Sequence, residues 1–266
     1  MCRRFFHQKS VGIGIVFFSE GDSVYHSEFY GSHGAISERM TYVFMDEFGD
    51  TGDKPMEVGK GIFNPSKVFG FGCTVTGDPE RLGRVSQEIR DAKGISKEVK
   101  ARKLDYREKV EMSRYLVMTA TVSYALGLDK NMATQSVTWM SNDGVHRQVM
   151  MLVRTLDMVL SQRSGSFYHV VFDDHNSYKP SVARTALDNG FEWLSERHGV
   201  DLTCESARSS SGEFKDQLQS NDIVPHSMIL QLEREEPLIS GILGVRQRLL
   251  GKTCVQGRMP PQIHTT

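Results

Sequence analysis

The chain has 266 residues, of which 39% are hydrophobic and 24% charged, a composition typical of a globular protein and not of a disordered or fibrous one. Its formal net charge of −1 excludes a strong overall basic field that would attract nucleic acid from a distance. No apolar run approaches the length of about 20 residues that a membrane-spanning helix needs, so we expect no membrane partner.

The cysteines predict a reducing environment. Cys2, Cys73, Cys204 and Cys254 form no C-x-x-C pair, which argues against a structural zinc site. Cys73 and Cys204 lie in apolar, strand-like runs, and we predict that both are buried free thiols. Free thiols are typical of a reducing compartment, so we expect a cytoplasmic protein.

The organisation along the chain predicts one main domain. Residues 1–39 are interpreted as an N-terminal extension, either an extra pair of strands or an upstream extension of the reading frame. Residues 40–232 carry the regular alternation of elements and form the predicted domain. Residues 233–266 form a basic C-terminal segment that we expect to be partly disordered, because residues 237–266 contain no Asp or Glu.

The first strong element is an apolar run that ends in carboxylates. Tyr42, Val43 and Phe44 favour a strand, and Asp46 and Glu47 follow directly. A buried carboxylate costs free energy unless it is paired or binds a metal. The run therefore predicts a strand that presents a carboxylate at the rim of a sheet, and the alternative is a strand end followed by an acidic turn.

The later elements follow in order along the chain. Hydrophobic periodicity predicts a strand at 68–76, helices at 79–92 and 106–118, a strand at 119–128, a helix at 145–160 capped by Asn142 or Asp143, a strand at 167–174, a helix at 180–197, a strand at 200–204, and a helix at 213–232 that Pro225 kinks or breaks. Strands come early, and strand–helix alternation follows. This order predicts an α/β fold with a mixed sheet flanked by helices.

The strand at 167–174 repeats the opening pattern, because it ends in Asp173 and Asp174. If it lies beside the first strand, the carboxylates converge at one edge of the sheet. Converging like charges need a cation, and oxygen ligands favour Mg²⁺ or Mn²⁺. Two such ions can stabilise both the attacking and the leaving oxygen of a phosphodiester. Metal-dependent phosphodiester hydrolysis follows as a hypothesis that assumes adjacent strands.

Two competing motifs fail at the first strand. An EF-hand loop that begins at Asp46 would have Phe48 at its third position and Thr51 where glycine is needed. A haloacid-dehalogenase phosphatase would need a second Asp where Phe48 stands. The Lys- and Arg-rich stretch 97–109 suits a phosphate-bearing polymer, although a solvated helix face is the commoner meaning of such a stretch.

Four segments, in the same order, resemble the motifs of the RNase H-like family catalogued as domain of unknown function 3800. They are Tyr42–Asp50, Glu98–Leu104, Val170–Asp173 and Leu218–Val224. The resemblance covers about residues 40–230. It implies an RNase H-like α/β fold, metal-dependent nuclease activity with Mg²⁺ or Mn²⁺, and an association with mobile elements and antiviral (phage) defence.

Carried over position by position, the resemblance implies a site of four carboxylates and one lysine. The metal ligands and catalytic groups would be Asp46, Glu98, Asp173 and Asp222, with Lys100 near the scissile phosphate. Second-choice ligands are Glu47, Asp174 and Asp216. The chain departs from the family pattern at Phe48, which need not bind metal. It also departs at Ser220, Asn221 and Pro225 around Asp222, for which Asp216 is the alternative ligand.

Two further functions are compatible with the sequence. The first is a catalytically inactive RNase H-like module that binds nucleic acid or a protein partner, which the altered residues around Asp222 favour. The second is a phosphotransferase or phosphatase for small substrates, which predicts a closed pocket instead of an open basic groove. DNA and RNA are both candidate partners of a nuclease, and a protein partner or a homo-oligomer is compatible with the sequence.

Overall fold

The computed structural model describes residues 40–49, 66, 68–129, 144–173 and 180–250. These residues all fall within one structural unit, Ser37–Thr266. Several predicted features lie outside the described residues: the extension 1–39, the helix cap at Asn142 or Asp143, the second-choice ligand Asp174, and the C-terminal segment after Leu250.

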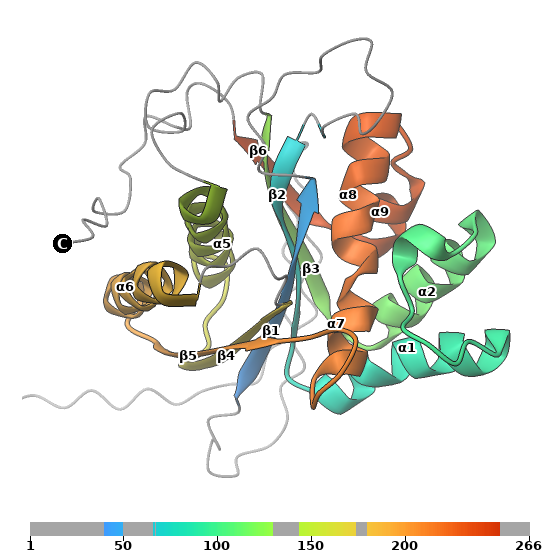
Figure 1. Ribbon diagram of the computed structural model, residues 1–266, viewed down its shortest axis with the longest axis horizontal. Helices are drawn as coiled ribbons and strands as arrows, with labels where there is room; N and C mark the ends of the chain where they lie inside the picture. The colour runs from blue at the N-terminus through green and yellow to red at the C-terminus, as the bar shows by residue number, and fades with distance from the viewer. Residues whose placement is uncertain (1–39, 50–65, 67, 130–143, 174–179, 251–266) are drawn as a thin grey trace, which may run out of the picture. The chain divides into compact units, whose positions relative to one another are not determined.

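A six-stranded mixed sheet organises the fold, in the order β5-β4-β1-β2-β3-β6 (Figure 1). The strands are β1 (Thr41–Gly49), β2 (Val68–Thr76), β3 (Val122–Asp129), β4 (Phe167–Asp173), β5 (Asp201–Ala207) and β6 (Arg246–Leu250). The pairs β1–β2 and β2–β3 are antiparallel, whereas β1–β4, β4–β5 and β3–β6 are parallel. The predicted α/β fold with a mixed sheet is confirmed.

Helices cover both faces of this sheet (Figure 1). The helices α5 (Gly144–Leu160) and α6 (Pro180–His198) lie on one face. The other face carries α1 (Pro79–Lys93), the 3-10 helix η1 (Ala101–Lys103), α2 (Tyr106–Met118), α7 (Lys215–Asn221), α8 (Ile223–Arg234) and α9 (Leu238–Leu243). None of the helices in the described ranges is long and apolar enough to cross a membrane.

The strand β1 sits near the middle of the sheet and contributes to both layers. Successive side chains of a strand point to opposite faces. Val43 and Met45 therefore join the apolar core under α5 and α6, while Phe44 joins the core under α1, α2, α7 and α8. Asp46, two residues after Phe44, lies on the same face as Phe44.

The helix α8 packs directly on β2. A Cβ atom at Gly72 would lie 2.8 Å from the backbone nitrogen of Pro225, which lies in the first turn of α8. Only a glycine leaves room for a backbone approach this close. This contact fixes where α8 begins on the sheet, and it thereby fixes the position of Asp222, the residue before α8.

The predicted helix at 213–232 is two helices. The break falls at Asp222, between α7 and α8, and not at Pro225 as predicted. Pro225 lies in the first turn of α8, where a helix has no partner for a backbone N–H and tolerates proline. The structure therefore places a carboxylate at the junction of two helices.

The predicted domain boundary at residue 232 is too early. The helix α9 contacts α2 and α8, and β6 adds a parallel strand beside β3, so the folded domain continues to Leu250. The strand was missed because Arg246–Leu250 is short and carries two arginines. Short, charged strands are typical of sheet edges and give a weak apolar pattern.

One cysteine prediction is confirmed and one is wrong. Cys73 is buried in β2 as a free thiol, whereas Cys204 is an exposed free thiol on β5. The reason is topological, since β5 is the edge strand of the sheet and is only partly covered.

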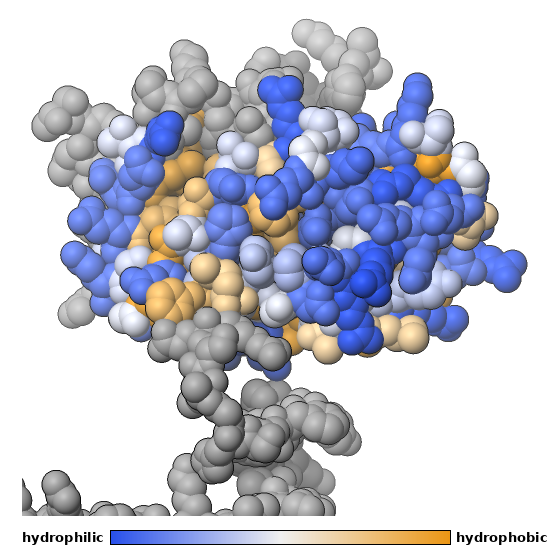
Figure 2. Space-filling model, turned by 90° about the horizontal axis from the view of Figure 1, so that it is seen from below, coloured by the Kyte–Doolittle hydropathy of each residue, from blue (hydrophilic) through white to orange (hydrophobic). Residues whose placement is uncertain are grey.

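The two layers also differ at the surface. Figure 2 shows the molecule from below. Hydrophilic residues cover most of the side that carries α1 and α2, whereas apolar residues reach the surface on the side of α5 and α6.

Candidate active site

The two acidic strand ends lie next to each other, as the sequence hypothesis assumed. β1 and β4 are parallel neighbours in which Met45 stands opposite Phe172, and the next residues are Asp46 and Asp173. Val171 and Phe44 both belong to the core under α7 and α8, so Asp46 and Asp173 point to that face. Each aspartate is 8% exposed. The pair therefore places two nearly buried carboxylates side by side at the carboxyl edge of the sheet.

Asp222 reaches the same place from the junction of α7 and α8. Burial, together with the nearby carboxylates of Asp46 and Glu98, raises the pKa of Asp222 to about 7. The Ala101 N–H and the Lys100 ammonium oppose this rise but do not cancel it. A carboxyl group with a pKa this far above its ordinary value is typical of a site that gathers negative charge.

Glu98 and Lys100 complete the group from the segment that precedes η1. The Lys100 Nζ lies 2.7 Å from the Glu98 Oε1. Burial alone would lower the pKa of Lys100, but the hydrogen bond to Glu98 and the charges of Asp222 and Asp173 hold it above its ordinary value. The pKa of Glu98 is lowered despite burial, because Lys100 and Ser209 both bond its carboxylate.

All the first-choice residues thus come together, and we call them the carboxylate cluster: Asp46, Glu98, Lys100, Asp173 and Asp222. They come from four separate segments of the chain, namely the ends of β1 and β4, the segment before η1, and the α7–α8 junction. The sequence motifs selected these positions, and the tertiary fold is what brings them into one place.

Main-chain donors hold one oxygen of each aspartate in the cluster. The three bonds are Glu47 N–H to Asp46 Oδ1 at 2.8 Å, Ser209 N–H to Asp173 Oδ1 at 3.0 Å, and Ala101 N–H to Asp222 Oδ2 at 2.6 Å. Hydrogen bonds from fixed backbone groups to a carboxylate are strong and set its orientation. These bonds therefore fix the orientation of the three carboxylates.

Ser209 is a member of the site that sequence reasoning missed. It is 6% exposed and lies after β5, in a run of serines that predicts only a polar loop. Its hydroxyl donates to Glu98 Oε1 at 2.5 Å and accepts from Lys100 Nζ at 3.1 Å, while its N–H holds Asp173. Nothing in its local sequence distinguishes Ser209 from its serine neighbours.

The second-choice ligands lie elsewhere or outside the described residues. Glu47 points to the opposite face of the sheet, where Gln148 Nε2 donates to its Oε2 at 2.8 Å. Asp216 lies in the first turn of α7 and faces α1, where it pairs with Arg90 at 2.6 Å and accepts from Gln87 at 2.8 Å. Asp174 belongs to the part of the chain that the structure does not describe. The structure therefore separates Glu47 and Asp216 from the carboxylate cluster.

The carboxylate oxygens of the cluster are suitable ligands for a divalent cation, but the carboxylates are not arranged around a single metal position. Four carboxylates against one lysine leave excess negative charge, which a cation bound by oxygen ligands would offset. Among the described side chains, however, no group of three or more His, Cys, Asp or Glu is arranged to hold one metal ion. Glu98 is instead bonded to Lys100 and Ser209. A bound ion would have to draw the carboxylates closer together than they lie.

No family model matches the chain, and no curated protein matches it. Among solved structures, the chain is similar to one described as the PCNA:RNase HII complex from Archaeoglobus fulgidus, with 12% identity, 75% of each chain covered and a TM-score of 0.42. A similarity this low supports no conclusion about activity.

Proposed function

We propose that this chain is a metal-dependent nuclease with an RNase H-like fold, which hydrolyses phosphodiester bonds in nucleic acid. The observation that carries the proposal is the meeting of Asp46, Asp173, Asp222 and Glu98 at the carboxyl edge of two adjacent parallel strands. Ligand sites of open α/β sheets are generally found at this edge. Folding four acidic groups together destabilises the protein, and such an arrangement is common where it serves binding or catalysis.

The residues of the cluster have distinct roles in this proposal. Asp46, Asp173 and Asp222 would supply oxygen ligands, with Glu98 as the fourth. A bound divalent cation would supply Lewis-acid stabilisation of the phosphoryl oxygens and a more acidic water. Lys100 lies beside these carboxylates, where its ammonium would neutralise charge on a nearby phosphate.

The surroundings of the cluster support a phosphate-bearing polymer as the substrate. Lys97, Arg102 and Lys103 are exposed and flank Glu98 and Lys100 in the sequence. Lys103 also helps to lower the pKa of Glu98, so its charge acts within the cluster. Basic groups around an acidic centre would draw a phosphate backbone toward carboxylates that would otherwise repel it.

The resemblance to family 3800 supports the same proposal. The positions that it implies, Asp46, Glu98, Asp173 and Asp222, are distant in sequence and are neighbours in the fold. We extend the proposal to membership of that family on this basis. The mobile-element or antiviral-defence setting depends on the family resemblance alone.

The test is cleavage of single- and double-stranded DNA and RNA in Mg²⁺ or Mn²⁺. We expect metal-dependent cleavage by the wild type that is lost in both Asp46→Ala and Asp173→Ala. Asp201→Ala is the matched control, because Asp201 is an exposed aspartate at the start of β5, away from the carboxyl edge. Cleavage that survives in Asp46→Ala and Asp173→Ala would contradict the proposed site.

A second function is favoured by one observation, the engagement of Glu98 by Lys100 and Ser209 in place of a three-carboxylate metal site. This arrangement suits an RNase H-like module that binds nucleic acid or a protein without cleaving. Calorimetric titration with Mn²⁺ distinguishes the two functions. Nucleic-acid binding with neither Mn²⁺ binding nor cleavage would favour the inactive module.

A further inference from the structure

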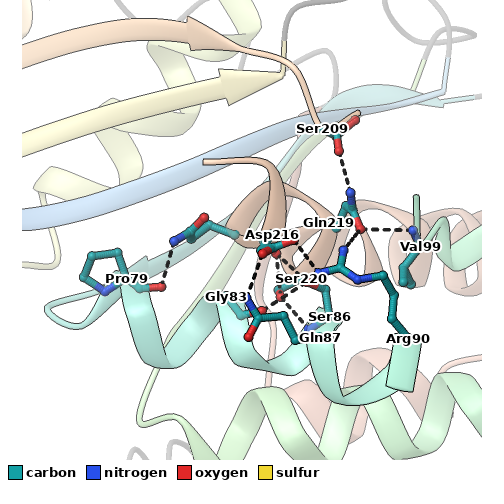
Figure 3. Close-up of polar contacts among 11 residues, drawn as sticks. Pro79, Gly83, Ser86, Gln87, Arg90, Val99, Ser209, Asp216, Gln219 and Ser220 are labelled. Atoms are coloured by element: carbon teal, nitrogen blue, oxygen red, sulfur yellow. Dashed lines mark hydrogen bonds and ion pairs between the residues drawn. The ribbon is translucent and has the colours of Figure 1, made fainter. Parts of the chain in front are cut away.

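Gln219 lies on α7, three residues before Asp222, and its side chain joins three other segments of the chain (Figure 3). Its Nε2 donates to the Ser209 carbonyl at 2.6 Å. Its Oε1 accepts from the Val99 N–H at 3.0 Å and from Arg90 Nη1 at 2.8 Å. The residue is 2% exposed, so these bonds form away from water, where an unpaired amide would be costly.

Two of the partners of Gln219, Val99 and Ser209, are adjacent to or bonded to members of the carboxylate cluster. Val99 stands between Glu98 and Lys100, so a bond to its N–H fixes the backbone that carries both side chains. Ser209 in turn holds Asp173 through its N–H and contacts Glu98 and Lys100 through its hydroxyl. One amide group therefore links the segment that carries Glu98 and Lys100 to the segment whose Ser209 bonds Asp173.

The third partner, Arg90, holds Gln219 from helix α1. Arg90 uses one arm of its guanidinium for Gln219, and the other arm pairs with Asp216 at 2.6 Å. Because the guanidinium is planar and rigid, it transmits the position of Asp216 to Gln219. Asp216, a second-choice ligand from the sequence, thus lies at the base of a chain of contacts that runs from Asp216 through Arg90 and Gln219 to Ser209 (Figure 3).

We propose that Gln219 is a positioning residue for the nuclease reaction, acting through Ser209 and the Val99 backbone to hold Glu98, Lys100 and Asp173 in register. The inference rests on the proposed function for its catalytic consequence, but not for the contacts themselves. Gln219 does not itself meet the substrate. Its effect is on geometry, where a misplacement of about 1 Å can lower a rate about 100-fold.

The first test measures amide hydrogen exchange at Val99 and Ser209, which requires no substrate. Gln219→Met removes both halves of the amide and should speed exchange at both positions by about 10-fold. Gln219→Glu keeps an acceptor for Val99 and Arg90 but loses the donor to the Ser209 carbonyl. It should therefore loosen the Ser209 segment and speed exchange of the Ser209 N–H, which is bonded to Asp173, while the Val99 N–H stays protected. Unchanged exchange in both variants would overturn the inference.

Gln217→Met is the matched control. Gln217 is also a glutamine of α7 and also donates to a backbone carbonyl, that of Pro79 at 3.2 Å, but it contacts no member of the cluster. We expect this variant to leave exchange at Val99 and Ser209 unchanged. An equal effect of Gln217→Met and Gln219→Met would reduce Gln219 to a general contribution to helix packing and overturn the inference.

The second test measures cleavage kinetics. We expect Gln219→Met to lower kcat about 10-fold or more with little change in KM, while Gln217→Met changes neither. Faster exchange in Gln219→Met with an unchanged kcat would overturn the positioning role. An inactive wild type would overturn the proposed function and the catalytic part of this inference together, while the exchange experiment would still decide whether Gln219 holds the two segments.

Discussion

The two faces of the sheet are built from the same strands but carry different side chains at the carboxyl edge. Under α5 and α6, the sheet meets an apolar layer in which Val43, Met45 and Leu156 are fully buried. Under α7 and α8, an apolar layer gives way at the carboxyl edge to buried carboxylates and a polar network around Gln219. The adjacent residues Asp46 and Glu47 belong to opposite faces. One face therefore mainly stabilises the fold, whereas the other holds buried charge at some cost in stability.

The largest effect is expected on the apolar face. Leu156→Ala should lower the free energy of unfolding by about 2–5 kcal/mol, because Leu156 is fully buried in the core under α5 and α6. Urea denaturation measures this loss. The half-buried Met158 on the same helix provides the control, since Met158→Ala should cost clearly less. A loss below about 1 kcal/mol for Leu156→Ala would mean that this face does not carry the main core.

The comparison is sharpest at Asp46 and Glu47. Asp46→Asn should lower metal-dependent cleavage by about 100-fold or more, because it removes a charge from the carboxylate cluster. Glu47→Gln should leave cleavage nearly unchanged, because Glu47 faces Gln148 on the other side of the sheet. Steady-state cleavage rates at equal folded concentrations provide the measurement. Equal losses in the two variants would show that the face of the sheet does not decide function.

The excess charge on the acidic face predicts an unusual pH dependence. The pKa of Asp222 is raised from 3.8 to about 7, so between these pH values the folded chain retains a proton that the unfolded chain releases. This group should therefore make the metal-free protein less stable as pH rises from about 4 to about 7. Asp222→Asn keeps an acceptor for Ala101 and removes the charge, so it should abolish this loss and gain about 1 kcal/mol or more at pH 8.

Denaturation with urea in the presence of EDTA, at pH 4.5 and pH 8, measures this difference. The exposed Asp201 offers a control, because Asp201→Asn should shift stability by a similar small amount at both pH values. Parallel pH dependence in the wild type and Asp222→Asn would contradict the raised pKa of Asp222.

The smallest effect is expected at the N-terminus of α2, where a helix cap stabilises the helix locally. Asp105 caps α2 and forms a capping box with Glu108, with both reciprocal bonds at 2.8 Å. Asp105→Ala should lower the free energy of unfolding by about 1 kcal/mol and leave cleavage unchanged. Thermal unfolding and the cleavage assay together check this. A loss of cleavage in this variant would mean that the cap of α2 contributes to the site.

Local sequence determined the elements because their signals are local. The strand at 68–76 and the helix at 106–118 agree with β2 and α2 because alternating or continuous apolar runs and capping residues lie within the elements themselves. The edge strand β6 and the break at Asp222 escaped prediction, because each depends on contacts with distant elements. β6 exists only by pairing with β3, and the position of α8 depends on its approach to Gly72 of β2.

The carboxylate cluster likewise combines features that local sequence predicts with features that depend on distant contacts. The apolar runs before Asp46 and Asp173 predict that both residues end strands, and the family resemblance adds Glu98, Lys100 and Asp222. The three-dimensional packing shows that these residues meet, that Glu47 faces away, and that Ser209 bonds Asp173 and Glu98 while Gln219 bonds Ser209. The physical reason is that the identity of a side chain is encoded at one position, whereas its partners are set by the packing of segments that lie far apart in the chain.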